Sequence, residues 1–102
     1  MPQITLDMPA LEKIAPVIRI LSHPLRLRIL DFLETSGKPQ RVTEIVEASE
    51  GAQQAIVSQQ LKILRESGIL SASRRGNCVY YSINDCKSLF FLACIRQQSQ
   101  TQ

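Results

Sequence analysis

The period of the hydrophobic pattern changes after Gly68, and this change constrains the fold more than any other feature of the chain. Before Gly68, apolar residues recur every three or four positions, as they do along the buried stripe of a helix. After it, the run ILSASRRGNCVYYSI alternates with a period of two, which is typical of strands, and Gly76-Asn77 divides it as a hairpin turn would. The sequence therefore predicts several helices combined with one β-hairpin.

Four helices are expected before the hairpin. Their ranges are 8–21, 24–36, 43–49 and 53–67. Asp7 and Thr43 are predicted N-caps, because a side-chain oxygen there can accept a hydrogen bond from a free backbone N–H. Gly37 ends the second helix, and Pro16 is expected to kink or restart the first one.

A last helix is expected over 85–98, followed by a polar, frayed tail at 99–102. Its apolar residues wrap most of the way round the helix; they are Leu89, Phe90, Phe91, Leu92, Cys94 and Ile95. One small domain cannot bury all sides of such a helix, so a second subunit is expected to cover part of it.

The composition is that of one small globular domain spanning residues 1–102. The chain is 44% hydrophobic and 21% charged, with a net charge of +3 and a pI near 9.0. The N-terminus lacks the pattern of a secretory signal, and no apolar run is long enough to cross a bilayer, so a cytoplasmic location is expected. Basic residues gather between positions 59 and 75, which indicates a surface for a polyanion.

Two short helices joined by a tight polar turn and followed by a basic hairpin form the layout of a winged helix-turn-helix. The expected fold is therefore mainly α with a small β-hairpin, with the helix-turn-helix at 43–67 and the wing at 69–83. The second helix of the pair needs an apolar face for docking, and Val57, Leu61 and Leu64 supply it.

The polar face of that helix suits contacts with base edges. The amide side chains of Gln54 and Gln59 can bind adenine bidentately, Ser58 can bind any base, and Ile56 can contact a thymine methyl group. Basic residues farther along the helix and at the hairpin tip suit phosphates or a narrow minor groove. The predicted DNA-binding residues are Gln53, Gln54, Ile56, Ser58, Gln59, Lys62, Arg65, Arg74 and Arg75.

Two motifs resemble the ArsR–SmtB family of bacterial winged-helix repressors over roughly residues 16 to 95. The pattern P-x-R-L-x-I-L is met by Pro24, Arg26, Leu27, Ile29 and Leu30. The pattern V-S-x-H-L-x-x-L-R-x-x-G-L is met by Val57, Ser58, Leu61, Leu64, Arg65 and Gly68, with Gln60 where a histidine is usual. The run NCVYYSI, which starts at Asn77, completes the likeness.

The resemblance implies a homodimer that binds an imperfect DNA palindrome and is released by an inducer. It also implies that the first and last helices, 8–21 and 85–98, form the dimer interface. The interface residues expected on this basis are Leu11, Ile14, Ile18, Leu89, Phe90, Phe91 and Cys94.

The metal sites of the family are not met by this sequence. A thiolate site would place cysteines where the chain has Arg41 and Thr43. An interfacial zinc site on the last helix would begin at Asp85, but Lys87 replaces its first histidine and the tail offers no further ligand. His23 is the only histidine of the chain, so no metal or other cofactor is expected.

The three cysteines leave two interpretations open. On one helix, Cys86 and Cys94 would lie about 12 Å apart along the axis, too far for a disulfide within one chain. Cys94 is then either a small apolar residue in the dimer interface or part of a sensor of oxidants or soft metalloids, paired across the dimer with Cys94 or Cys86 of the second subunit. Cys78, on the outer face of the hairpin, is expected to be the most accessible of the three.

Arg26 and His23 each fit two roles. Arg26 fits either a structural salt bridge or a DNA contact, and His23 fits a helix cap or a surface position. A winged-helix module that only dimerises or binds a protein partner is the second class of function, although the basic wing argues against it. An enzyme is not expected, because the chain has no phosphate-binding glycine loop and no catalytic set built around its single histidine.

Overall fold

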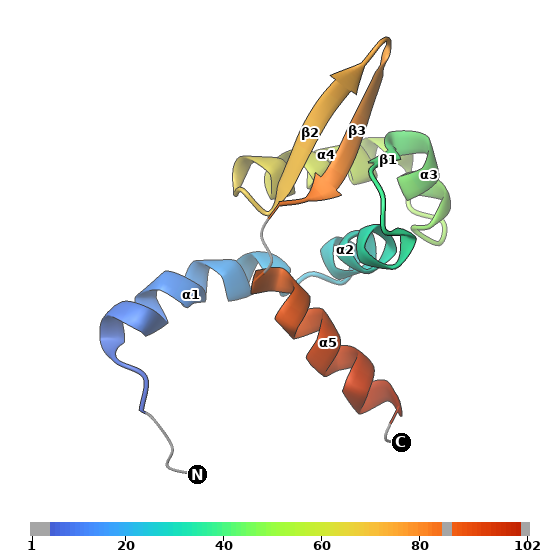
Figure 1. The fold of residues 1–102 in the computed structure, drawn as a ribbon. Helices are drawn as coiled ribbons and strands as arrows, with labels where there is room; N and C mark the ends of the chain where they lie inside the picture. The colour runs from blue at the N-terminus through green and yellow to red at the C-terminus, as the bar shows by residue number, and fades with distance from the viewer. Residues whose placement is uncertain (1–4, 85–86, 101–102) are drawn as a thin grey trace.

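The computed structural model describes residues 5–84 and 87–100, and for 87–90 and 100 it describes the backbone alone. The helices are α1 (Met8–Leu21), α2 (Pro24–Ser36), α3 (Val42–Glu47), α4 (Gln54–Glu66) and α5 (Lys87–Gln100). The strands are β1 (Gln40–Arg41), β2 (Leu70–Arg75) and β3 (Cys78–Ile83). Figure 1 shows a mainly helical fold from which the hairpin β2–β3 projects, as predicted for a winged helix-turn-helix.

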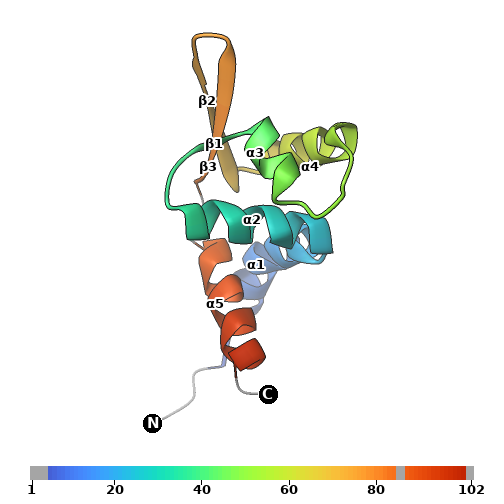
Figure 2. The same ribbon diagram turned by 90° about the vertical axis from the view of Figure 1, so that its right-hand side faces the viewer.

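Helix α2 is the central layer of the molecule. In Figure 2 it lies between α3 and α4 on one side and α1 and α5 on the other. Eleven apolar side chains of the described residues are buried in the core; they are Leu21, Ile29, Leu30, Leu33, Ile45, Val57, Leu61, Leu64, Ile69, Leu70 and Leu92. Because they recur at helical spacing in α2 and α4, these two helices pack face to face.

The sheet has three antiparallel strands in the order β1-β3-β2, one more than the predicted hairpin. The two-residue turn at Gly76 and Asn77 joins the paired residues Arg75 and Cys78, as expected, and Gly76 adopts a φ of 64°. Strand β1 pairs Gln40 with Tyr81. A strand of two residues is too short to create a period of two, so the sequence pattern did not predict it.

Of the two predicted N-caps, Asp7 is confirmed and Thr43 is wrong. Asp7 caps α1 as predicted, with its Oδ1 accepting a hydrogen bond from the Ala10 backbone N–H at 3.0 Å. Thr43 is not a cap, since α3 starts at Val42 and its N-cap position is Arg41, two residues before Thr43. The Arg41 backbone N–H is satisfied instead by the carboxylate of Glu44, three residues on, at 2.9 Å.

The C-terminal helix ends two residues later than predicted, and Pro16 does not restart the first one. Helix α5 continues through Ser99 and Gln100, so the frayed tail predicted at 99–102 is wrong for its first two residues. Glutamine is a good helix former, which favours this extension. Positions 85–86 and 101–102, where the predicted helix begins and the predicted tail ends, lie outside the described residues. Helix α1 runs unbroken through Pro16.

The half-buried side chain of Arg26 joins three helices. Its Nε donates a hydrogen bond to Oε1 of Gln60 in α4 at 2.7 Å, and its Nη1 donates to the Ile20 carbonyl in α1 at 3.1 Å. Gln60 is buried, with 8% of its surface exposed. Of the two roles considered for Arg26, the structure supports the structural one, although through hydrogen bonds rather than a salt bridge.

We expect Arg26→Met to lower the free energy of unfolding by about 1–3 kcal/mol, because it leaves a buried amide oxygen without its donor. Urea denaturation of the variant and the parent measures this loss. In the matched double variant Arg26→Met/Gln60→Leu no buried acceptor remains, so it should recover much of the stability. Losses that simply add in the double variant would contradict a coupling between the two side chains.

Candidate nucleic-acid interface

Helix α4 has a buried apolar face and an exposed polar face. Val57, Leu61 and Leu64 are fully buried against α2 and α3, and Gln60 is held among them by Arg26. The predicted DNA-binding residues of this segment are all exposed; they are Gln53, Gln54, Ile56, Ser58, Gln59, Lys62 and Arg65. Gln53 occupies the N-cap position, so it lies at the entrance of the helix. The helix thus presents amides, a hydroxyl group and two cations to solvent.

The wing presents two further cations. Arg74 and Arg75 are exposed at the end of β2, next to the turn, and in Figure 1 this turn is far from both chain ends. The guanidinium carbon of Arg75 lies 5.1 Å from the centre of the Tyr80 ring, in a cation–π contact. Tyr80 therefore supports the wing arginine.

Arg41 is a basic residue of this surface that the sequence analysis did not predict. Strand β1 places it opposite Tyr80 of β3, so it lies beside the middle of the wing. Its guanidinium is paired with Glu44, with Nη2 and Oε2 2.6 Å apart. The same hydrogen bonds lower the pKa of Glu44 to about 2 and raise the pKa of Arg41. The available signal was the Arg-x-x-Glu spacing, which indicates an ion pair at a helix start.

The predicted dimer helices expose apolar side chains in the single chain. Leu11 is 40% exposed and Ile18 is 45% exposed, whereas Ile14 and Phe91 are half-buried. The side chains of Leu89 and Phe90, also predicted for this interface, lie outside the described residues. On the same two helices, Met8 of α1 is 63% exposed and Ile95 of α5 is 46% exposed. Exposed apolar patches of this kind mark interaction surfaces.

The cysteines and the histidine form no metal site in the described part of the chain. Cys94 is exposed and Cys78 is half-buried, so the prediction that Cys78 would be the more accessible of these two is wrong. Cys86 lies outside the described residues. His23 occupies the N-cap position of α2 without a side-chain cap, and its Nδ1 has no hydrogen-bond partner there. Residues 5–84 and 87–100 contain no group of three potential metal ligands from His, Cys, Asp and Glu.

A helix-turn-helix domain model matches residues 21–71, which contain α2, α3 and α4. The chain belongs to the helix-turn-helix family of transcriptional regulators. Among the residues that the structure describes, no helix is long and apolar enough to span a membrane.

Named relatives agree with this assignment. The regulator NmtR of Mycobacterium tuberculosis is 37% identical over 84 residues, 82% of this chain and 68% of NmtR. The uncharacterised HTH-type regulator Rv0081 of the same species is 38% identical over 69 residues; these are 68% of this chain but only 59% of Rv0081. Further relatives from Bacillus anthracis and Xylella fastidiosa are named as repressors.

The solved structures confirm the resemblance to ArsR-type proteins. The homodimeric winged helix-turn-helix domain of Mb0332 from Mycobacterium bovis, described as a possible ArsR-family regulator, matches with a TM-score of 0.71 and 27% identity. The match covers 98% of this chain and 91% of that domain. The three-stranded sheet and the five helices therefore form a winged helix-turn-helix.

The low pKa of Glu44 predicts how the Arg41–Glu44 pair depends on pH. The folded pKa, about 2, lies below the ordinary value of 4.5, so the pair contributes its full stability above about pH 4.5. That contribution is lost as the pH falls through the folded pKa. NMR titration should give a midpoint near 2 for Glu44, and Arg41→Gln should move it back toward about 4.3. A midpoint that does not move would assign the low pKa to another group.

Proposed function

We propose that this protein is a homodimeric, sequence-specific DNA-binding repressor. The observation that carries the proposal is the exposed polar face of α4 next to an arginine-tipped wing, on the side of the molecule away from both chain ends (Figure 1). A helix with this division of faces can dock through its apolar side and enter a major groove with the other. The relatives, which are bacterial regulators, support the same conclusion and a cytoplasmic location.

The residues of this surface divide into two groups by the DNA atoms that they suit. Gln54 and Gln59 carry amides that match adenine N6 and N7, and the exposed Ile56 suits a thymine methyl group. Lys62, Arg65 and the wing arginines suit phosphates, which hold the protein in register without reading sequence. Gln53 and Ser58, at the start and the middle of the same exposed face, complete the proposed contact set.

The dimer follows from the exposed apolar residues of α1 and α5. A second copy related by a two-fold axis would bury the same patch on both subunits and would present two α4 helices to DNA. Such a pair reads two inverted half-sites, so an imperfect palindrome is the DNA that it fits. A winged-helix module without DNA binding is the competing function, and the exposed cations of α4 and the wing favour DNA. Nothing in this arrangement points to an enzyme.

We expect Gln54→Ala and Gln59→Ala each to weaken binding to the operator by about 1–3 kcal/mol while leaving binding to random duplex nearly unchanged. Arg75→Ala serves as the matched control, because it should weaken binding to both DNAs and reduce the slope of log K against log salt by about 1. Fluorescence anisotropy with fragments of the protein's own promoter and with random DNA measures all of these quantities. Equal losses on both DNAs for the glutamine variants would refute the recognition-helix assignment.

Cys94 is exposed on α5, so its thiol is accessible to an inducer. An inter-subunit switch that uses Cys86 and Cys94 would release DNA on addition of arsenite, peroxide or a persulfide donor. We expect this release to be lost in the double variant Cys86→Ser/Cys94→Ser, with binding in reducing buffer unchanged. Cys78→Ser is the control for a cysteine on the wing. If the double variant still releases DNA on addition of these reagents, the switch hypothesis is wrong and Cys94 is a packing residue.

A further inference from the structure

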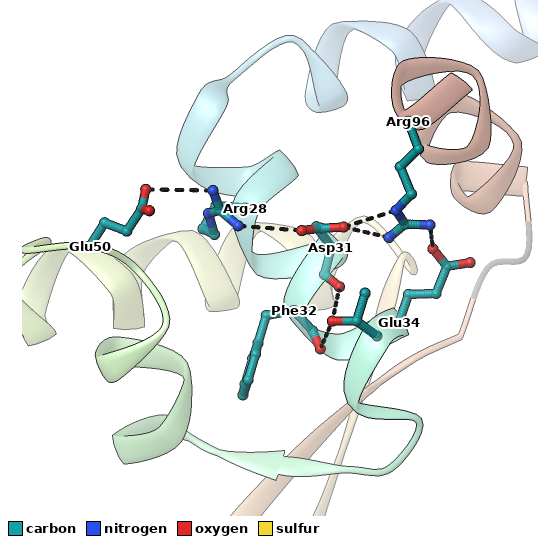
Figure 3. A network of polar contacts seen from close by, with 7 residues as sticks. Arg28, Asp31, Phe32, Glu34, Glu50 and Arg96 are labelled. Carbon is teal, nitrogen blue, oxygen red and sulfur yellow. Dashed lines mark hydrogen bonds and ion pairs between the residues drawn. The ribbon is translucent and has the colours of Figure 1, made fainter. Parts of the chain in front are cut away.

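Five charged residues connect the C-terminal half of α5 with the turn before α4. In Figure 3 the Arg96 guanidinium of α5 faces two carboxylates of α2, those of Asp31 and Glu34. Its Nε donates to Asp31 Oδ1 at 3.1 Å, and its Nη1 donates to Glu34 Oε1. Asp31 also pairs with Arg28 at 3.3 Å, and Arg28 reaches Glu50 at 3.5 Å. We call Arg96, Glu34, Asp31, Arg28 and Glu50 the α2 ion-pair chain.

Within the α2 ion-pair chain, the contacts at Arg96 are stronger than those at Glu50. The Arg96, Asp31 and Glu34 side chains are 35%, 33% and 29% exposed, so water screens them only partly. The guanidinium of Arg96 makes three hydrogen bonds to the two carboxylates. Such a fork fixes the orientation of the side chain, which a single lysine contact would not do. The two carboxylates raise the pKa of Arg96. Helix α5 is thereby held at a defined angle on α2.

Apolar packing of Phe91 and Leu92 against the core also holds α5. Leu92, one helical turn before Arg96 and on the same face, is buried, but Ile95 between them is 46% exposed. An open groove separates α5 from the start of α2 and from the turn at Ser49–Ala52, and its lining includes Arg28, Asp31 and Arg96. With an open groove beside the helix, Leu92 and Arg96 are two of the contacts that set its tilt.

The other end of the α2 ion-pair chain, Glu50, lies in the turn that precedes α4 and sets its direction. Glu50 adopts a φ of 50°, the only positive φ of a non-glycine residue in the described part of the chain, and Gly51 follows at 92°. Three residues later α4 begins at Gln54. The Arg28–Glu50 pair therefore acts on a tight turn next to the proposed base-reading residues. It is the weaker end, since the Glu50 side chain is 76% exposed.

We propose that the α2 ion-pair chain is a positioning element for operator binding: it fixes the angle between the dimerisation helix α5 and the helix-turn-helix, and thus the separation of the two α4 helices in the dimer. The inference rests on the proposed function. A dimer reads half-sites one helical turn of DNA apart, about 34–36 Å, and this spacing is a geometric property of the protein. A tilt of α5 on α2 displaces the whole helix-turn-helix and wing of that subunit. Loss of the α2 ion-pair chain therefore makes the separation of the two α4 helices less defined and leaves each α4 intact.

The test measures spacing preference with Asp31→Asn and Arg96→Gln. Each dimeric variant is titrated with a set of palindromes whose half-sites are moved apart or together by one and two base pairs, and with a single half-site. We expect affinity for the best-spaced palindrome to fall about tenfold, the order of one mismatched base pair. The ratio between the best and the altered spacings should shrink, and affinity for the single half-site should change much less than affinity for the palindrome. Arg96→Lys, which keeps the charge but not the fork of hydrogen bonds, should lie between parent and Arg96→Gln.

General electrostatics predicts the opposite result for one of these variants. Asp31→Asn removes a negative charge from a protein of net charge +3, which by itself strengthens binding to any DNA. Glu47→Gln is the matched control, because it removes an exposed carboxylate of α3 that lies outside the ion-pair chain. It should leave the spacing preference sharp. Glu34→Gln removes only one partner of Arg96 and serves where Arg96→Gln does not fold.

The outcomes separate the two proposals. If the parent protein binds no palindrome better than random DNA, the proposed function fails. If the parent binds a palindrome and folded variants keep its sharp spacing preference, the positioning role is wrong. Sedimentation at the working concentration checks the subunit state, and variants that become monomers would also overturn the inference, because the ion pairs would then hold subunits together instead of setting an angle.

Discussion

The packing of α4 on α2 and α3 is the interaction on which the rest of the structure depends. Val57, Leu61 and Leu64 of α4 are fully buried, as are Ile29 and Leu30 of α2. Each such side chain contributes about 1.5–3 kcal/mol on burial. An isolated helix of this length is marginal in water, so α4 is a helix because this face has a place to dock. Its outward face is thereby free to carry groups chosen for a partner.

Helix α2 gives the fold two separate functions on its two sides. On one side, α2 faces the core under α4 with Ile29, Leu30 and Leu33. On the other side, Asp31 and Glu34 pair with Arg96 of α5. These residues are close in sequence, yet the helical period divides them between faces. Arg26 adds a polar connection from α2 to α1 and α4. Helix α2 therefore connects both dimer helices with α4.

The sequence predicted the parts of the fold that repeat a local pattern. The apolar stripes, the cap at Asp7 and the hairpin turn at Gly76 were found because each depends on neighbours a few residues away. The exposed face of α4 followed from the same stripe. Strand β1 was missed because it is too short to have a period. The pairs Arg26–Gln60 and Arg96–Asp31 join residues 34 and 65 positions apart, and no local spacing encodes such contacts.

The exposed apolar residues of α1 and α5 connect these observations to the proposed dimer. Leu11, Ile18 and Ile95 cost free energy in water, and a second copy of the chain can cover them all with one symmetric contact. In Figure 1 both helices leave the body on the side opposite the wing, so this contact would not block the α4 surface. Helix α2, which contacts α1, α4 and α5, then joins the interface to the reading surface. A change in how two subunits pack would reach DNA as a rotation of α2 with α4 attached, without any change in the residues that touch a base.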